Sequence, residues 1–348
     1  MGKMMKNCVN LAIKSMVMKG FFSLFLTIIY VSLCGCSGSG LSGVEADSVP
    51  PVAIERFDRA VGSFGTMPES GKDSVVSLYE PVIKVMGRIE NVADADSLMS
   101  MLSASRATAV FQPDIESYLP DLSAAEASLG VLKDRMAASA VGFPSRVFGA
   151  VIPYDQSVII ADSIAIIGLN HYLGYDYPGY AGFDDYRRQL KVPSRIAGDL
   201  AEALVYTSLP YVSDAGATAL SRMIYEGLVL AVVMEALPDL TLQSALAYDD
   251  GQMDWALQNE ARIWEKMATD NMLYNSDPAV AMRLVAPSPS TNIVNPSSPG
   301  RIGRFVGYRI VEAYLSVNPE KSPDQLLSDR AYYNASFLVG SGYTGRGK

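Results

Sequence analysis

Three acidic side chains and one histidine have the residue types and spacing that could support chemistry. Asp199 and Glu202 stand three positions apart, so a helix would place both on one face, as a carboxylate cation site requires. Many solvated helix faces share that spacing, so it is not specific. His171 is the only histidine in the chain. Without a second histidine or a cysteine beside it, a hydrogen-bonded packing role is the more common alternative to a ligand role.

Glu226 is the most informative of these residues. Its helical neighbours are apolar (Met223, Leu230 and Val233), so we expect its carboxylate to be buried. A buried carboxylate must be paired or protonated. It could be a ligand or general base in a remnant cleft with Asp199, Glu202 and His171. It could also form a structural ion pair with Arg222, Arg301 or Arg304, and we favour the ion pair.

Arg301 is a candidate anion or ion-pair residue. It stands at the start of the last long predicted helix, where backbone amides are exposed, although capping is the ordinary alternative. A tyrosine cluster between Tyr172 and Tyr186 could line a groove for a peptide or sugar, because tyrosine combines apolar area with a polar tip. The same cluster could instead fasten the sheet to the helices.

The inventory of cysteine and histidine excludes several chemistries. The cysteines are Cys8, Cys34 and Cys36, all near the N-terminus. With one histidine, the chain cannot build a two-histidine zinc site of the H-E-x-x-H kind. The sequence also contains no G-x-S-x-G motif, which would support a serine nucleophile. We therefore expect no metal, no cofactor and no catalysis.

The N-terminal segment predicts a lipoprotein. Residues 1–35 carry four lysines, no acid and an apolar run that is short for a membrane span, which is typical of a signal peptide. The sequence Leu33-Cys34-Gly35-Cys36 resembles a bacterial lipoprotein cleavage box, with Cys36 as the lipidated residue. An uncleaved anchor helix is the alternative. Residues 36–51 are rich in Gly and Ser and predict a flexible tether.

The charge of the remaining chain restricts its partners. After residue 35 the chain has 24 basic and 37 acidic residues, a net charge of about −13, which argues against nucleic acid and against electrostatic docking on anionic lipid. Membrane attachment must then come from acyl chains such as palmitate on Cys36, since several chains together anchor stably. The residues after Cys36 lack an acidic cluster, so we expect an outer-membrane lipoprotein that faces the periplasm.

Helices dominate the predicted fold. Apolar residues recur at three-to-four spacing over 73–91, 114–138 (broken at Pro120), 193–207, 216–236 and 251–273. A last long helix follows Ser298, which can cap it. Gly300, Gly303 and Gly307 would leave one line of this helix bare, so that another backbone could approach closely. The run 228–234 is apolar on every side, which indicates a central core helix.

Three short β-branched runs predict strands at 145–152, 157–161 and 163–170, in a small antiparallel sheet. Helices outnumber strands and lie apart from them along the chain. The predicted fold class is therefore α+β, mostly α. No interior linker divides residues 52–348, so we expect a single domain there.

Several segments, in one order along the chain, resemble the GldB-like gliding-motility lipoproteins. They are Ile54–Asp58, Ile166–Tyr180, Met223–Gly227, Trp255–Trp264, Leu273–Asp277 and Ser298–Gly303. The chain departs from the family pattern at Asn170-His171, where an Asp is more usual. The resemblance implies a lipid-anchored cell-envelope protein that supports gliding, or the secretion apparatus that gliding depends on. Its partners would be envelope proteins of that machinery.

The family is also similar, remotely, to zinc metallopeptidases of the Glu-ligand type. That similarity implies a degenerate zincin-like arrangement. Glu226-Gly227 would match the helix of the third ligand, and the helix with Asp199 and Glu202 would match the H-E-x-x-H helix without its histidines. The expectation is a protein that binds other proteins without catalysis. The alternative is a divergent hydrolase that retains a carboxylate-only site.

Overall fold

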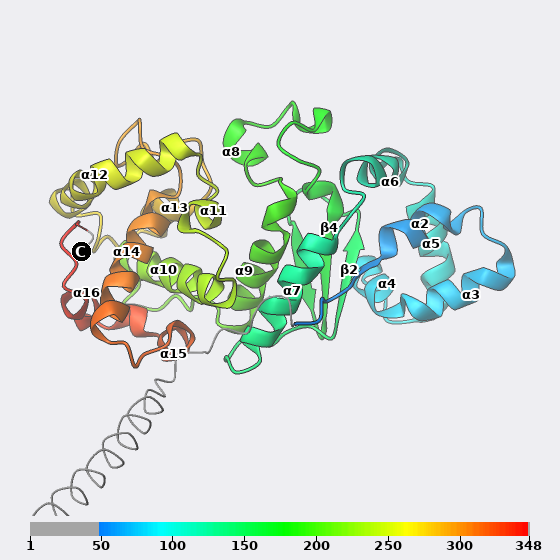
Figure 1. The fold of residues 1–348 in the computed structure, drawn as a ribbon, viewed down its shortest axis with the longest axis horizontal. Coiled ribbons are helices and arrows are strands. Elements are labelled where there is room, and N and C mark those ends of the chain that lie inside the picture. The colour runs from blue at the N-terminus through cyan, green and yellow to red at the C-terminus, as the bar shows by residue number, and fades with distance from the viewer. Residues whose placement is uncertain (1–48, 347–348) are drawn as a thin grey trace, which may run out of the picture. The chain divides into compact units, whose positions relative to one another are not determined.

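Four short strands form one mixed sheet in the computed structural model, which describes residues 49–346. They are β1 (Ile54–Arg56), β2 (Arg146–Ala150), β3 (Val158–Ala161) and β4 (Ile164–Gly168), in the order β1-β2-β4-β3 (Figure 1). The proposed signal peptide, Cys36 and nearly all of the tether lie outside the described residues.

Helices make up most of the described chain, which confirms the predicted α+β, mostly α class. They are α2 (Phe57–Phe64), α3 (Glu69–Leu78), α4 (Glu80–Gly87), α5 (Ala95–Ser103), α6 (Arg106–Tyr118), α7 (Ser123–Met136), α8 (Asp185–Arg188), α9 (Ile196–Ser208), α10 (Ala219–Ala236), α11 (Leu242–Leu246), α12 (Asp250–Thr269), α13 (Pro278–Val285), α14 (Ile302–Val317), α15 (Pro323–Ser328) and α16 (Ser336–Ser341).

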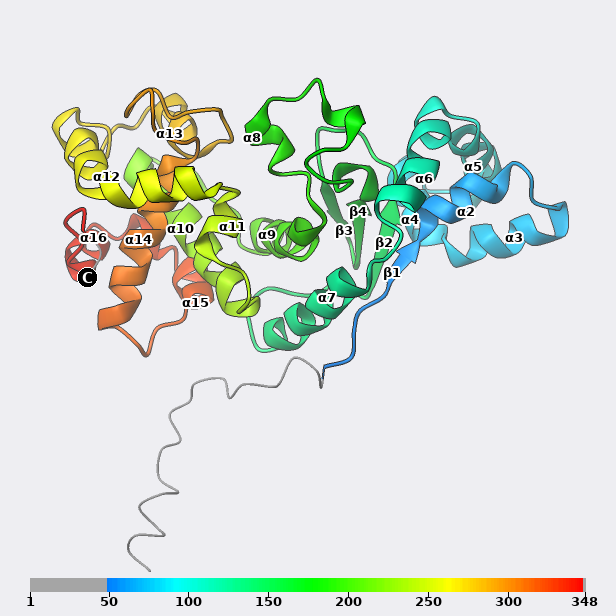
Figure 2. The same cartoon turned by 45° about the horizontal axis from the view of Figure 1, so that its top comes forward.

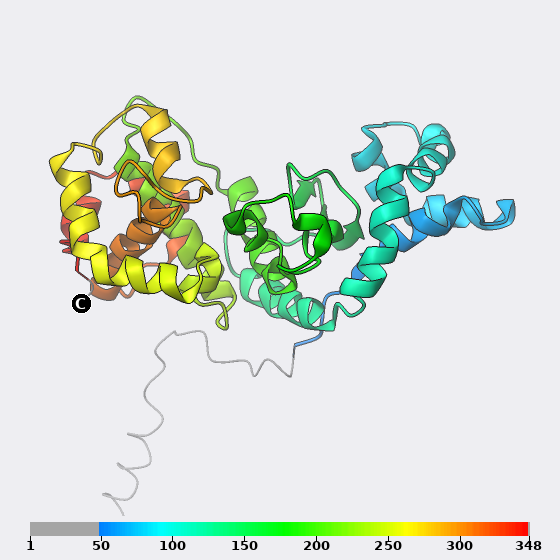
Figure 3. The ribbon, with the colours of Figure 1, turned by 90° about the horizontal axis from the view of Figure 1, so that it is seen from above.

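The sheet separates two apolar cores. Successive side chains of a strand point to opposite faces, so Phe148 and Ile166 pack with the apolar residues of α2–α5, whereas Val147 and Ile167 join the larger core of α7, α9 and α10. Figure 2 shows the strands between α7 and α9 on one side and α2–α6 on the other. Seen from above in Figure 3, α10–α16 gather on the far side of α9 from the strands.

The prediction that the sheet is antiparallel is wrong for two of its three strand pairs. β1 with β2 and β2 with β4 are parallel, and only β3 with β4 is antiparallel. After β2 the chain crosses to the sheet edge, forms β3, and returns through a two-residue turn at Asp162 (φ 49°) into β4. β4 therefore fills the place between β2 and β3. The three-residue strand β1 was not predicted, since its partner β2 lies about 90 residues away.

The predicted helix over 73–91 is two helices. α3 ends at Leu78 and α4 begins at Glu80, with Pro81 in the first turn of α4. Proline has no N–H, and its ring clashes with the carbonyl four residues earlier, which favours the break between the two helices at this point. The predicted break near Pro120 is confirmed, because α6 ends at Tyr118 and α7 begins at Ser123.

Helices α10 and α14 cross at two glycines in the core. A Cβ atom on Gly307 would lie 1.8 Å from the Met223 carbonyl oxygen, and one on Gly227 would lie 2.2 Å from the Gly307 carbonyl carbon. The predicted close approach along the glycine line is thus confirmed. The predicted cap is wrong, because the Ser298 hydroxyl donates to the Thr291 carbonyl at 3.2 Å. The Thr291 hydroxyl instead accepts from the Ile302 N–H at 3.3 Å.

Candidate functional site

A cavity of about 480 Å³ lies beside α9, a size typical of small-molecule sites. Its wall comes from the loops after β2 and β4, from α8 and α9, and from the segment that precedes α14. Four of the five residues that the sequence singled out as cleft or anion candidates line it, namely His171, Asp199, Glu202 and Arg301. Glu226 does not line it.

Parallel pairing of β2 and β4 brings two of these wall segments together, because the loops that follow parallel strands leave the sheet at the same edge. Asn170 joins them. Its side-chain oxygen accepts from the Ile152 N–H at 3.0 Å, and its amide donates to the Ile152 carbonyl at 2.9 Å. An aspartate carboxylate at this position could make only the first of these bonds. Asn170 thereby places His171 against the ring of Tyr154.

The two carboxylates on α9 are both held by arginines. Arg195 donates to Asp199 at 2.7 Å, and Tyr172 donates to the other oxygen of the same carboxylate at 2.9 Å. Arg304 donates to Glu202 at 2.9 Å. Burial by itself would raise the pKa of Glu202, but the charges of Arg304 and nearby arginines hold that pKa below its usual value. Glu202 is therefore ionised at pH 7, and each of the two carboxylates contacts an arginine.

Glu226 is 3% exposed and lies behind the cavity wall, in contact with the lining residue Tyr206. Arg222 donates to one of its oxygens at 3.0 Å. Its other oxygen accepts from the Tyr206 hydroxyl at 2.6 Å and lies 3.3 Å from Arg304 Nε. Because both oxygens are engaged, the ion pair favoured from the sequence is present, with Arg222 and Arg304 as partners. Arg304 links Glu226 to Glu202.

His171 is buried at the cavity wall and neutral at pH 7. Its Nε2 lies 2.9 Å from the Pro153 carbonyl oxygen, and its Nδ1 lies 3.3 Å from the Lys191 ammonium. These partners fit an imidazole that donates from Nε2 and accepts at Nδ1. Burial and the Lys191 charge lower the pKa of His171 to about 4.

Arg301 is 8% exposed and adopts left-handed backbone geometry with φ 61°. Its guanidinium donates to the Leu246 carbonyl at 3.3 Å. No carboxylate of residues 49–346 comes within 4.0 Å of its guanidinium. Burial and the charges of Arg304 and Arg195 lower its pKa to about 10. Of the three arginines offered from the sequence as partners of Glu226, Arg222 and Arg304 form the ion pair and Arg301 does not.

The tyrosine cluster is mainly part of the core. Tyr172, Tyr177 and Tyr180 are each at most 6% exposed. Tyr180 donates to the Asn170 carbonyl at 2.6 Å, and Tyr177 donates to Asp114 on α6. These contacts hold the loop after β4 together and fasten it to α6. Tyr186 alone among the tyrosines of this cluster lines the cavity.

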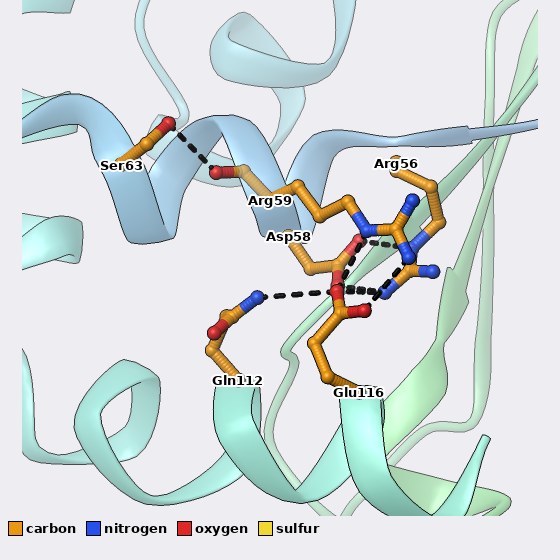
Figure 4. Close-up of polar contacts among 6 residues, drawn as sticks. All are labelled: Arg56, Asp58, Arg59, Ser63, Gln112 and Glu116. Carbon is orange, nitrogen blue, oxygen red and sulfur yellow. Dashed lines mark hydrogen bonds and ion pairs between the residues drawn. The ribbon is translucent and has the colours of Figure 1, made fainter. Parts of the chain in front are cut away.

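The segment Ile54–Asp58, which carries part of the family resemblance, ties the sheet to α6 through an ion-pair network (Figure 4). Arg56 donates to the buried Asp58 at 2.8 and 2.7 Å and to Glu116 at 2.8 Å. Arg59 makes two further bonds to Glu116, at 2.6 and 2.7 Å. These bonds from Arg59 are the main cause of the lowered pKa of Glu116. This network positions the N-terminal helices and leaves no carboxylate free for chemistry.

A zinc ion of the metallopeptidase kind does not fit these residues. Among residues 49–346, no group of three or more His, Cys, Asp or Glu side chains could hold a metal. His171, Asp199, Glu202 and Glu226 each already contact a cationic side chain. The cationic side chain beside each of these groups would repel a metal ion.

Sequence reasoning missed Lys191 and Tyr154. Lys191 is 7% exposed and lines the cavity. In the sequence it follows Arg187 and Arg188 in a polar stretch, which is typical of a solvated surface. No local signal distinguishes it, because its burial depends on the rings of Tyr154 and Phe183, whose centroids lie 4.6 and 5.3 Å from its ammonium.

These features define a helix-rich α+β protein with a cavity beside α9, where Asp199 and Glu202 are ion-paired and the buried cations Lys191 and Arg301 line the wall. The family model described as gliding motility protein GldB matches residues 42–345, and the chain belongs to this family. No curated protein and no solved structure matches the chain. Within residues 49–346, the helices lack the length and apolar content that crossing a membrane requires.

Proposed function

We propose that this chain is a lipid-anchored protein of the cell envelope that supports gliding motility, or the associated secretion apparatus, by binding other envelope proteins without catalysis. Family membership supports the motility role. The observation that carries the non-catalytic role is the engagement of both Glu226 oxygens by Arg222, Tyr206 and Arg304. A general base needs a lone pair directed at substrate.

Membrane attachment in this proposal comes from acyl chains on Cys36. Cells that express the chain are fed a labelled fatty acid, and incorporation into the protein is measured for the wild type, Cys36→Ala and the neighbouring control Cys34→Ala. We expect label in the wild type and in Cys34→Ala and none in Cys36→Ala. Equal labelling of Cys36→Ala would refute the anchor. Placement in the outer membrane, facing the periplasm, is tested by separating the two membranes.

A divergent hydrolase is the second candidate, favoured by the meeting of His171, Asp199 and Glu202 at one cavity. Metal analysis and a peptidase assay of the purified full chain distinguish the hydrolase from the non-catalytic binding protein. The binding role predicts no stoichiometric metal and no peptide cleavage. Chelator-sensitive cleavage that disappears in Glu226→Gln would establish the hydrolase instead.

Partner binding is tested by cross-linking in intact envelopes. We expect adducts with components of the motility or secretion machinery in cells that carry the wild-type chain. Adducts with none of them, under conditions that cross-link those components to one another, would contradict a binding role.

A further inference from the structure

The cavity beside α9 holds two buried cations that have no acidic partner within residues 49–346. Arg301 is 8% exposed and Lys191 is 7% exposed, and both line the cavity. Of the three carboxylates in the wall, Asp199 pairs with Arg195 and Glu202 pairs with Arg304. The third, Asp155, is exposed and forms no ion pair with either cation among the described residues. Buried charges in proteins are normally paired, so this arrangement indicates that the missing partner is a ligand.

Burying these two positive charges costs the ligand-free protein folding free energy. Burial lowers the pKa of Lys191 to about 8 and contributes to lowering that of Arg301 to about 10. The aromatic rings around Lys191 and the Leu246 carbonyl at Arg301 offset part of the cost.

We propose that this cavity binds the carboxylate group of a small organic anion, with Arg301 and Lys191 as its charge partners. The site is defined by residues 154–301 of the described chain and does not depend on the envelope role proposed above. The carboxylate could belong to a free organic acid or to the C-terminal end of a peptide, because both present the same group.

The charge of the wall favours a singly charged anion over a phosphate dianion. The cationic side chains of the wall are Arg187, Lys191, Arg195 and Arg301, and the anionic ones are Asp155, Asp199 and Glu202. With His171 neutral, the wall carries a net charge of about +1. The planar guanidinium of Arg301 also matches the two oxygens of a carboxylate.

The rest of the wall suits an uncharged body attached to that carboxylate. Tyr154, Tyr186 and Tyr206 contribute aromatic rings, and Val158 and Leu190 contribute aliphatic area. The volume of about 480 Å³ exceeds what a carboxylate alone would fill, so the ligand has room for such a body.

The test is isothermal titration of the full chain, purified in detergent, with four probes. These are benzoate, N-acetyl-trialanine, the C-terminal amide of that peptide, and inorganic phosphate. We expect at least one of the two carboxylates to bind with one-to-one stoichiometry and the amide to bind at least about tenfold more weakly than its acid, since the charge-assisted bonds are lost. Tighter binding of benzoate indicates a free organic acid, and tighter binding of the peptide indicates a chain end.

Variants locate the site. Arg301→Met and Lys191→Met should each weaken carboxylate binding at least about tenfold. The control Arg262→Met, on an exposed face of α12, should leave it unchanged. If Arg301→Met does not fold, Arg187→Gln replaces it, because Arg187 is exposed at the wall, and should weaken binding severalfold.

Four results would overturn the proposal. They are equal affinity for the peptide and its amide, tighter binding of phosphate than of both carboxylates, no binding of either carboxylate at millimolar concentration, and full affinity in the folded cavity variants.

Discussion

The replacement Glu226→Gln tests whether the Glu226 carboxylate has a structural or a catalytic role. The side chain is 3% exposed and both of its oxygens are engaged. Removing one member of a buried ion pair costs about 3–5 kcal/mol, because the other charge is left unpaired. Two features reduce that cost here. Arg304 keeps its bond to Glu202 at 2.9 Å, and the Arg222 side chain is 25% exposed and can turn toward water.

We therefore expect Glu226→Gln to lower the free energy of unfolding by about 2–3 kcal/mol. Urea titration followed by far-ultraviolet circular dichroism measures this change as a shift in midpoint at constant slope. The control is Glu265→Gln on α12, since Glu265 is exposed and forms no side-chain ion pair within residues 49–346. The control should change stability by less than about 0.5 kcal/mol.

An unchanged or increased stability of Glu226→Gln would refute this reasoning. Catalytic groups are often held in environments that destabilise the fold, and replacing them commonly stabilises the protein. A gain in stability would therefore indicate that the carboxylate is retained for function, and would support the hydrolase candidate in place of the binding role.

Two further predictions concern packing and pH. Gly227→Ala should lower the free energy of unfolding by at least about 2 kcal/mol, because its Cβ would meet backbone atoms of α14 at 2.2 Å. Gly198→Ala, whose Cβ would meet only Leu240 at 3.6 Å, should instead stabilise α9 by up to about 1 kcal/mol. Thermal unfolding of both variants measures these changes. Equal changes in the two variants would contradict the close contact between Gly227 and α14. His171 has a folded-state pKa of about 4 against 6.5, so the unfolded state binds the extra proton and stability should fall by up to about 3 kcal/mol as pH falls from 6.5 toward 4. His171→Gln should reduce that slope in urea titrations, and an unchanged slope would show that His171 is not the group responsible.

Much of the fold follows from local sequence patterns. The helices around Glu202 and Glu226 were predicted within a few residues of α9 and α10, because apolar periodicity and turn residues act over short stretches. The break at Pro81 was missed although its signal is local, since a matching apolar stripe on both sides of Tyr79 concealed it.

The strand directions could not be read in the same way. The runs at β2, β3 and β4 were recognisable, but adjacent runs separated by turns favour an antiparallel reading. The order of strands in the sheet depends on which strand fills the place beside β2, and β1 completes the sheet from about 90 residues away.

The sequence by itself determined which chemically reactive side chains this protein contains and where most of its helices lie. One histidine and three N-terminal cysteines limit the available chemistry, and the alternation of apolar and polar residues sets most of the helices. Only the tertiary structure decided which charges are neutralised. Arg304 reaches Glu202 across 102 residues, whereas Arg301, three residues before Arg304, reaches no carboxylate of residues 49–346. The physical reason is that ion pairing depends on distances of a few ångströms between side chains, and these distances are set by how remote helices pack.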